Sequence, residues 1–267
     1  MVEWLRFLIL GLIQGLTEPL PISSSGHMVI AQVFLDIPNL DYFLEIFLHF
    51  ASLIAIVILF KERIIRLIKG NWNYLIRRKS DYRADFDYLI LIIIGVFPAA
   101  LIGVLFKSFF EGFLTLIAVG ISLLITGTFL FLVQKQSVEN TKTRLNVWDA
   151  LTVGLVQVLA LFPGISRSGS TFVGGLLRKI KFETLIEFSF MLYIPISLGG
   201  MIFELFEVES FTNYAPLSLV VSFIATLIST YFAFKLFVHL VKQGNLKYFG
   251  VYCYFAGVFA IVLSFIV

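Results

Sequence analysis

The stretch GLIQGLTEPLPISSSGH at residues 11–27 occurs a second time, altered, as GLVQVLALFPGISRSGS at residues 154–170. At a constant offset of 143 residues the identical positions are Gly11 and Gly154, Leu12 and Leu155, Gln14 and Gln157, Leu16 and Leu159, Ile22 and Ile165, Ser23 and Ser166, Ser25 and Ser168, and Gly26 and Gly169. The repetition indicates two homologous halves. Each copy runs from an apolar helix into a cluster of Pro, Gly and Ser. Because irregular backbone at membrane depth is tolerated only where it is buried in protein or lines a cavity, the two clusters indicate a site between the halves.

The composition indicates the environment of the chain. Of its 267 residues, 59% are hydrophobic and 14% are charged, and the mean hydropathy is +0.97. Soluble proteins average about 25% charged residues, so these values predict an integral membrane protein. The net charge of +3 gives no reason to expect a nucleic-acid partner. The single cysteine, Cys253, lies in an apolar run, which is typical of a packing residue rather than of a disulfide or a cysteine-held metal.

Six apolar stretches are each close to the ~20 residues that a helix needs to cross a bilayer: 43–60, 88–107, 114–133, 185–206, 215–241 and 247–267. The segments 4–34 and 147–177 are apolar too, but Pro, Gly and hydroxyl residues interrupt each one, which predicts a re-entrant helix-loop-helix hairpin. Each half then has one hairpin and three spans, and the odd number of crossings inverts the second half. The expected fold is an all-α integral membrane protein, a single membrane domain over 1–267. Its inverted-topology repeat (about 1–140 and 144–267) has six transmembrane helices plus two re-entrant hairpins.

Basic residues give an independent view of this topology, because Lys and Arg gather in cytoplasmic loops. The loops at 61–87 and 134–146 are rich in both, and only Arg6, Lys107 and Arg167 fall outside the predicted cytoplasmic side. The first hairpin then enters from outside and the second from the cytoplasm. Both termini are expected outside, and the two serine-rich tips are expected to meet within the bilayer.

The second tip has the composition of an oxyanion site. It offers one arginine, freed backbone N–H groups at a helix start, and the hydroxyls of Ser166, Ser168, Ser170 and Thr171. Helix N-termini favour phosphate, and a guanidinium binds two phosphate oxygens at once. Ser and Gly also allow helices to pack closely in membranes, so the hydroxyls alone do not distinguish an oxyanion site from a packing interface. Arg167 favours the functional one, because an arginine deep in a membrane segment costs at least ~2.5 kcal/mol on insertion scales.

The first tip supplies complementary groups. Gln14 and Glu18 are four residues apart and share a helix face, where their oxygens suit a hard divalent cation. The residues after the Pro21 break are Ser23, Ser24, Ser25 and His27. His27 could move protons, and Ser24 could act as a nucleophile beside it. A lone histidine is more often a hydrogen-bonded structural residue, but the presence of Glu18 and Arg167 in the same membrane region favours a catalytic role for His27.

A second repeat-related pair of carboxylates is Glu45 and Glu187, at an offset of 142. Both lie near the start of a span, where an ionisable group needs a partner. We expect each to hold a hairpin through its backbone or hydroxyls, and metal binding by Glu45 stays open as an alternative. His49 and His239 are interpreted as packing or interfacial residues.

Three motifs together, QGLTE at 14–18, PISSSGH at 21–27 and PGISRSGST at 163–171, resemble those of the undecaprenyl-diphosphate phosphatase family, also called bacitracin-resistance proteins. The resemblance covers the whole chain, and the order and spacing of the motifs make it specific. It implies an enzyme of the bacterial plasma membrane that removes the terminal phosphate of the C55 polyprenyl diphosphate carrier at the outer face, using a divalent cation. That reaction recycles the carrier for cell-wall synthesis and confers bacitracin resistance.

The resemblance also implies roles for particular residues. Gln14 and Glu18 stand in the family's Glu/Gln-x-x-x-Glu element, Ser24 and His27 in its Ser-x-x-Gly-His element, and Ser166, Arg167 and Thr171 in its Pro-Gly-x-Ser-Arg-Ser-Gly-x-Thr element. Two positions depart from the family pattern. Gln14 stands where many members have Glu, which lowers the charge available to a metal, and Pro19 stands where a bulky aromatic is usual. Pro19 removes a backbone donor and should end the first half-helix at once.

The expected mechanism is phosphoryl transfer between the two tips. Glu18 and Gln14 would hold Mg²⁺ or Ca²⁺, and Arg167 would bind phosphate together with the hydroxyls of Ser23, Ser166, Ser168 and Thr171. The nucleophile is left open among Ser24, His27 and water.

The rival from another class is a transporter that flips a polyprenyl phosphate, since an inverted repeat suits transport. A weaker alternative is a non-catalytic lipid-binding or assembly protein. His27 with Ser24 beside an arginine favours the enzyme, because a transporter needs binding groups but no nucleophile. The expected partners are the polyprenyl diphosphate and membrane lipids. A homodimer, the lipid chain length and the identity of the metal stay open.

Overall fold

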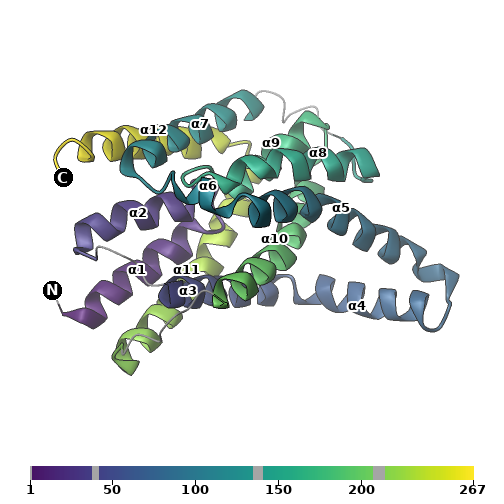
Figure 1. Ribbon diagram of the computed structural model, residues 1–267. Coiled ribbons are helices and arrows are strands. Elements are labelled where there is room, and N and C mark those ends of the chain that lie inside the picture. Colours follow the sequence, from purple (N-terminus) through teal and green to yellow (C-terminus); the bar gives the residue numbers. More distant parts are fainter. Residues whose placement is uncertain (1, 38–41, 135–140, 207–213) are drawn as a thin grey trace.

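The computed structural model describes residues 2–37, 42–134, 141–206 and 214–267 (Figure 1). Its helices in chain order are α1 (Glu3–Thr17), α2 (Ser24–Leu35), α3 (Tyr42–Leu59), α4 (Lys61–Leu75), α5 (Arg83–Leu105), α6 (Lys107–Glu111), α7 (Leu116–Gln134), α8 (Val147–Gln157), α9 (Arg167–Leu177), α10 (Phe182–Leu205), α11 (Pro216–Lys242) and α12 (Leu246–Leu263). In the described ranges, short 3₁₀ segments cover Ser80–Tyr82 and Val158–Leu161. The described residues contain no strand, only an isolated bridge between Lys142 and Ile180. The expectation of an all-α protein is confirmed.

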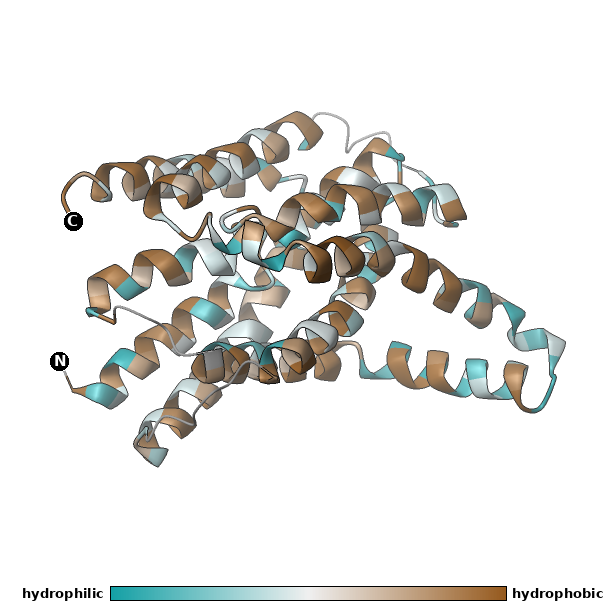
Figure 2. Ribbon diagram, viewed as in Figure 1, coloured by the Kyte–Doolittle hydropathy of each residue, from teal (hydrophilic) through white to brown (hydrophobic). Residues whose placement is uncertain are grey.

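The helices have the length and composition of a multi-pass membrane protein. Within the described ranges, five helices are long and apolar enough to cross a bilayer: α5 together with the 3₁₀ turn before it, α7, α10, α11 and α12. A sixth candidate is the pair α3 and α4, which is bent by 76° at Phe60. Apolar residues cover most of the ribbon in Figure 2, and hydrophilic ones gather at the α4–α5 end. The last five expected spans coincide with the five long helices, and the first, 43–60, lies on α3 of the bent pair.

One expected loop is largely helical. The basic stretch 61–87 contains α4, a 3₁₀ turn and the start of α5. Ile64, Leu67 and Ile68 recur at helical spacing between the lysines and arginines, which is the pattern of an amphipathic helix. The other basic loop, 134–146, falls partly outside the described residues, at 135–140.

Corresponding helices of the two halves have corresponding neighbours. The first-copy helix α1 packs along α11, and the second-copy helix α8 packs along α5. A repeated glycine allows each approach, because a Cβ on Gly11 would lie 2.4 Å from the carbonyl oxygen of Ser222, and one on Gly154 would lie 2.4 Å from that of Gly95. The first helix of each copy therefore packs against the other half.

A capping box and an ion cluster fix the start of α8. Asn146 and Asp149 exchange hydrogen bonds between side chain and backbone, of 3.0 and 2.9 Å. The fully buried Asp149 carboxylate also lies 2.5 Å from Lys142 Nζ and 2.9 Å from Arg178 Nε. Burial raises the pKa of Asp149, but the hydrogen bonds from Lys142, Asn146 and Arg178 more than offset it and hold that pKa below its ordinary value. The cluster ties both ends of the second hairpin together.

Candidate active site

The first tip begins where α1 ends. The helix stops at Thr17, and the N–H of Glu18 makes its last hydrogen bond, to Gln14 O at 3.0 Å. Pro19 follows and has no N–H to continue the ladder, so the expected end of the half-helix is confirmed. The chain re-enters a helix at Ser23, whose Oγ accepts from Gly26 N at 3.3 Å. Ser23 has a φ of 69°, a left-handed conformation that is strained for a residue other than glycine.

The second tip has the same cap at the corresponding positions. Ser166 Oγ accepts from Gly169 N at 3.1 Å. The hydroxyl pairs match as well, because Ser166 Oγ lies 3.2 Å from Ser168 Oγ, and the corresponding Ser23–Ser25 distance is also 3.2 Å. The two copies of the pattern therefore share the cap and the hydroxyl pair, although the backbone differs at the cap serine, with a φ of 69° at Ser23 and −68° at Ser166.

The two tips contact each other. Ser168 Oγ in the second tip donates to Leu20 O in the first at 3.1 Å. Gly164 has a φ of 92°, and a Cβ there would lie 2.7 Å from the Val119 carbonyl oxygen, so only glycine fits this turn against α7. A Cβ on Gly26 would in turn lie 3.1 Å from Gly164 Cα. The tips are packed backbone to backbone, which places their side chains in one site.

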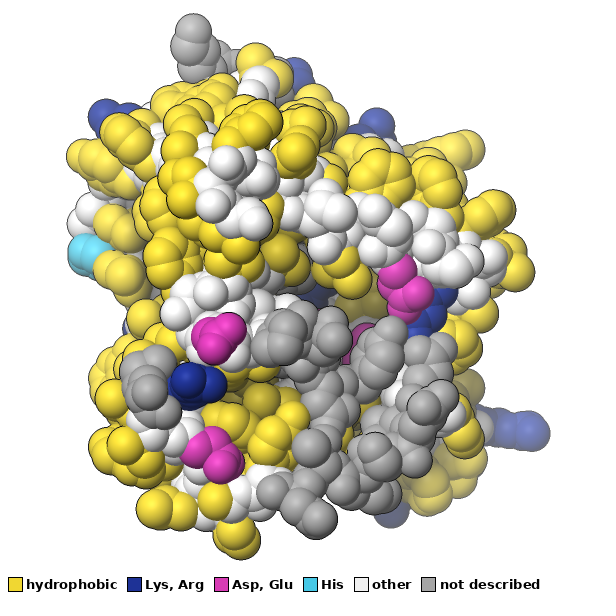
Figure 3. Space-filling model, turned by 60° about the vertical axis from the view of Figure 1, so that its left-hand side comes forward, with side chains coloured by type: hydrophobic (Ala, Val, Ile, Leu, Met, Phe, Trp, Pro, Cys, Tyr) yellow, Lys and Arg dark blue, Asp and Glu magenta, His cyan; other side chains and the backbone are white. Residues whose placement is uncertain are grey.

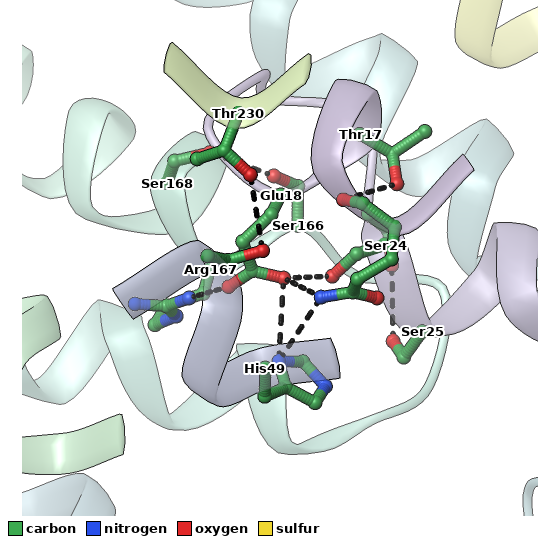
Figure 4. Close-up of polar contacts among 12 residues, drawn as sticks. Thr17, Glu18, Ser24, Ser25, His49, Ser166, Arg167, Ser168 and Thr230 are labelled. Atoms are coloured by element: carbon green, nitrogen blue, oxygen red, sulfur yellow. Dashed lines mark hydrogen bonds and ion pairs between the residues drawn. The ribbon is translucent and has the colours of Figure 1, made fainter. Parts of the chain in front are cut away.

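Glu18 is the centre of this site (Figure 4). Its Oε1 lies 2.5 Å from an Arg167 terminal nitrogen, and its Oε2 accepts from Ser24 Oγ at 2.5 Å. Gln14 Nε2 donates to the same Oε2 at 2.9 Å, and the two residues lie on one helix face as their four-residue spacing predicts. Ser24 and Arg167 occupy corresponding positions in the two copies. One carboxylate therefore holds the equivalent residue of each tip, one on each oxygen.

His49 is a site residue, although its sequence surroundings predicted a packing or interfacial residue. From α3, its Nδ1 lies 3.1 Å from Gln14 Nε2 and 3.6 Å from Glu18 Oε2. Its Nε2 lies 3.9 Å from Glu45 Oε1, one helical turn earlier. The signal that could have found it is this Glu-x-x-x-His spacing, because two ionisable groups on one face of an apolar span need a shared polar environment.

The Arg167 guanidinium is also held from α10. Its Cζ lies 3.9 Å from the centre of the buried Tyr193 ring, a cation–π contact that fixes the plane of the guanidinium. Thr171 Oγ1, one turn after Arg167, lies 2.5 Å from Ser189 Oγ, also on α10. Arg167 remains 26% exposed, so part of its fork can still reach a ligand.

His27 lies apart from this cluster. Its Nδ1 is 2.7 Å from the carbonyl oxygen of Ser23, and its Nε2 is 2.7 Å from the hydroxyl of Tyr252 on α12. The two rings are stacked, with centroids 5.5 Å apart. His27 lines an apolar groove of about 690 Å³ between α1, α2 and α12. Glu187 is also elsewhere, because its carboxylate pairs with Arg63 Nε at 2.7 Å instead of holding a hairpin.

The hydroxyls expected to bind phosphate are mostly engaged in building the tips. They are Ser23, Ser166, Ser168 and Thr171, and all four are buried. Ser23 and Ser166 cap helices, Ser168 bonds Leu20 O, and Thr171 Oγ1 donates to Ser168 O at 3.0 Å. The Ser24 hydroxyl differs, because its partner is the Glu18 carboxylate.

A cavity of about 230 Å³ adjoins the cluster, and its lining includes Glu18, His49, Gln157 and Arg167. Helix α10 closes it with residues between Ile196 and Glu204. The side of the molecule that carries both termini comes forward in Figure 3, where a hollow has hydrophobic walls with acidic and basic side chains at its edge. A guanidinium, a carboxylate and an imidazole at one cavity can bind an anion and move a proton.

A metal ion at this cavity would depend on few protein ligands. The described side chains include no group of three or more His, Cys, Asp or Glu residues placed to hold a metal ion. Magnesium, however, is usually held by one or two carboxylates together with substrate phosphates and water rather than by a protein cage. Glu18 with the neighbouring Gln14 fits that second arrangement.

Comparisons with known proteins agree with the motifs. The family model for the bacitracin resistance protein BacA matches residues 7–259. The chain is 43% identical over 261 residues to undecaprenyl-diphosphatase 1 of Bacillus cereus, covering 97% of each chain. It is 38% identical over 266 residues to undecaprenyl-diphosphatase 1 of Bacillus licheniformis (97% and 98% covered), and 37% identical over 262 residues to the undecaprenyl-diphosphatase of Oceanobacillus iheyensis (96% and 95% covered). A match of this extent and identity shows that the chain belongs to the BacA family of bacitracin resistance proteins.

Proposed function

We propose that this membrane protein removes the terminal phosphate of undecaprenyl diphosphate, leaving the monophosphate that cell-wall synthesis reuses. The observation that carries the proposal is the Glu18 carboxylate, which holds Ser24 on one oxygen and Arg167 on the other. In this arrangement Glu18, the proton acceptor, directly contacts both the nucleophile Ser24 and the phosphate-binding cation Arg167. Relatives that align over nearly their whole length are named undecaprenyl-diphosphatases.

In the proposed chemistry Ser24 is the nucleophile. Its Oγ attacks the terminal phosphorus while its proton passes to Glu18, and the bond from that phosphorus to the bridging oxygen breaks. Polyprenyl monophosphate leaves with that oxygen. Water then attacks the phosphoserine, its oxygen stays on the released phosphate, and a proton returns to Ser24. The oxygens of the diphosphate compete with Glu18 for Arg167, whose planar fork matches them.

The other candidate nucleophiles fit this geometry less well. His27 would have to leave both the Ser23 carbonyl and the Tyr252 hydroxyl to reach the Glu18 cluster. In our proposal it holds the strained Ser23 turn instead. His49, 3.6 Å from Glu18, is the histidine placed to receive or return a proton in the site.

A divalent cation would be held by Glu18, with Gln14 beside it, and by oxygens of the substrate. Bound there, it would neutralise negative charge on the diphosphate. Arg167 and the hydroxyls of the tips would stabilise the same negative charge from the protein side.

We also propose that the two halves form an inverted repeat in which α1–α2 and α8–α9 are re-entrant hairpins. The exchange of neighbours, α1 on α11 and α8 on α5, supports this arrangement. Cytoplasmic placement of the basic segments would open the site to the outer face of the bacterial plasma membrane. Labelling of single cysteines introduced at Glu62 and at Leu114 tests it, with Glu62→Cys expected to react from inside only and Leu114→Cys from outside only.

The deciding experiment for the function is phosphate release from undecaprenyl diphosphate by the purified full chain in detergent, with and without a chelator. The phosphatase predicts stoichiometric phosphate and polyprenyl monophosphate. A flippase, which the inverted repeat would suit, predicts no release and instead movement of polyprenyl phosphate across liposomes. Absence of released phosphate in protein shown to be folded would refute the proposal.

A further inference from the structure

Gln157 is a buried amide with no partner among the described residues. It is the last residue of α8, where the helix passes into the 3₁₀ segment Val158–Leu161, and it is 1% exposed. Neither its Nε2 nor its Oε1 has a hydrogen-bond partner in the part of the chain that the structure describes. The large majority of buried side-chain polar atoms in proteins are paired, so an amide with both ends unpaired calls for a physical reason.

The equivalent residue of the first copy shows what is different. Gln14 bonds Glu18 one turn later and His49 across the site. In the second copy Leu161 stands where Glu18 stands in the first, so Gln157 has lost its internal partner. An apolar residue would fit those surroundings without burying a polar group, yet the amide is present.

The position of Gln157 supplies the reason. It lines the cavity of about 230 Å³ together with Glu18, His49 and Arg167. A residue that lines this cavity borders the space that the proposed substrate must enter. The amide has one donor and one acceptor end, so it can bind a phosphate oxygen through Nε2 and a water through Oε1.

We propose that Gln157 is a substrate-binding residue whose Nε2 donates to an oxygen of the diphosphate. This inference rests on the proposed function and extends it to a residue of the repeat that lies outside the three family motifs at 14–18, 21–27 and 163–171. A neutral amide adds a hydrogen bond without adding charge, which suits a site where Arg167 already supplies the cation. The two copies of the repeated glutamine then differ in role, because Gln14 positions Glu18 and Gln157 binds the ligand.

The bound oxygen can belong to the phosphate that stays on the lipid or to the phosphate that is released. Product inhibition separates the two sources. Weaker inhibition of the Gln157→Leu variant by polyprenyl monophosphate would assign the amide to the lipid-linked phosphate. Weaker inhibition by inorganic phosphate would assign it to the released one. Unchanged inhibition by both would overturn the proposal.

The test uses the purified full chain and undecaprenyl diphosphate. Gln157→Leu removes both polar ends at similar size, and we expect kcat/KM to fall about tenfold to a hundredfold, as for a lost hydrogen bond to a charged group. The melting temperature should stay equal or rise, because an unpaired buried amide has been removed. Gln243→Leu, on an exposed glutamine beyond the end of α11, is the matched control and should match wild type.

A second variant, Gln157→Glu, keeps the shape of the side chain but replaces the amide with a carboxylate. A carboxylate cannot donate and repels the diphosphate, so a larger loss than in Gln157→Leu supports the proposal. If Gln157→Glu instead kept its activity and needed a lower concentration of the divalent cation, Oε1 would face a cation, and this result would overturn the proposal. So would a kcat/KM of Gln157→Leu within twofold of wild type, or a loss that parallels a lowered melting temperature. If wild type itself released no phosphate, the proposed function would fail first, before either variant is compared.

Discussion

The two tips are alike in the hydrogen bonds that cap their helices and unlike in the polar side chains that they bring to the site. Ser23 and Ser166 cap their helices in the same way, onto Gly26 and Gly169. The positions that differ are Glu18 against Leu161, Ser24 against Arg167, and His27 against Ser170. The shared residues form the caps, and among the differing residues are the carboxylate, hydroxyl and guanidinium of the Glu18 cluster. The repeated pattern thus gives two similar caps, and the differing positions place Glu18 and Ser24 on the first tip and Arg167 on the second.

The difference matters because the tips touch. Glu18 from the first reaches both Ser24 of its own tip and Arg167 of the other. A symmetrical pair would place either two carboxylates or two guanidiniums at the contact, and like charges in a buried site destabilise each other. Asymmetry is therefore what allows a neutralised cluster to form between two related turns.

Apart from Glu18 itself, the largest effect should come from Ser24, the proposed nucleophile of the first tip. Ser24→Ala is expected to lower kcat about a thousandfold, because the remaining groups bind the diphosphate but none attacks it. Ser25→Ala is the matched control, since Ser25 contacts Ser23 Oγ and not Glu18, and should lose no more than a few fold. Single-turnover assays with labelled substrate should trap phosphate on Ser24. Equal losses in both variants would show that the hydroxyls act only through the turn.

The cation of the second tip should come next. Arg167→Lys keeps the charge but lacks the planar fork and the cation–π contact with Tyr193, so kcat/KM should fall about a hundredfold. Arg77→Lys, on the exposed segment after α4, serves as the control and should be unchanged. Near wild-type turnover of Arg167→Lys would mean that the tip supplies only a point charge.

A smaller effect is expected at the far side of the first tip. Tyr252→Phe removes the hydroxyl that lies 2.7 Å from His27 Nε2, and kcat should fall about fivefold, the equivalent of one neutral hydrogen bond. Tyr248→Phe in the same groove is the control. A loss as large as that of Ser24→Ala would instead place the His27–Tyr252 pair in the chemistry.

The smallest effect on activity should come from the anchor of the second hairpin. Asp149→Asn removes a buried carboxylate that Lys142 and Arg178 hold, and should lower the free energy of unfolding by about 1–3 kcal/mol while kcat changes less than threefold. Because the pKa of Asp149 in the fold is below its unfolded value of about 3.9, the wild-type stabilisation is complete above that pH and is lost as the pH falls below it. Melting curves at pH 7 and pH 3 should therefore differ more for wild type than for Asp149→Asn. An identical pH dependence of melting in both proteins would show that the Asp149 carboxylate does not stabilise the fold through its charge.

Local patterns predicted the parts of the molecule that depend on local geometry. The apolar runs located the spans, and the four-residue spacing predicted that Gln14 and Glu18 share a helix face. Pro19 marked the end of α1 because a missing N–H acts within one turn. The repeat pointed to two tips in one site, since equal segments of related halves occupy equivalent places.

Contacts between distant elements could not be predicted in the same way. His49 joins the site only because α3 packs beside α1, and Glu187 pairs with Arg63 only because α4 bends by 76° away from α3. The proximity of Ser24 and His27 in sequence suggested a pair. At a helix start, however, the imidazole turns back to the Ser23 carbonyl while the Ser24 hydroxyl turns to Glu18. Side-chain direction at a helix terminus depends on the cap, and the cap here is a strained serine.

The central claim is that one carboxylate coordinates both tips in phosphoryl transfer, and Glu18→Gln tests it most directly. The variant keeps the shape of the side chain but can neither accept the Ser24 proton nor neutralise Arg167. The measurement is phosphate release from undecaprenyl diphosphate by the purified variant and by Glu62→Gln, an exposed glutamate on α4, with melting curves for both. We predict wild-type rates for Glu62→Gln and, for folded Glu18→Gln, a loss of about a thousandfold or more. Retention of more than a tenth of wild-type activity by folded Glu18→Gln would contradict the claim.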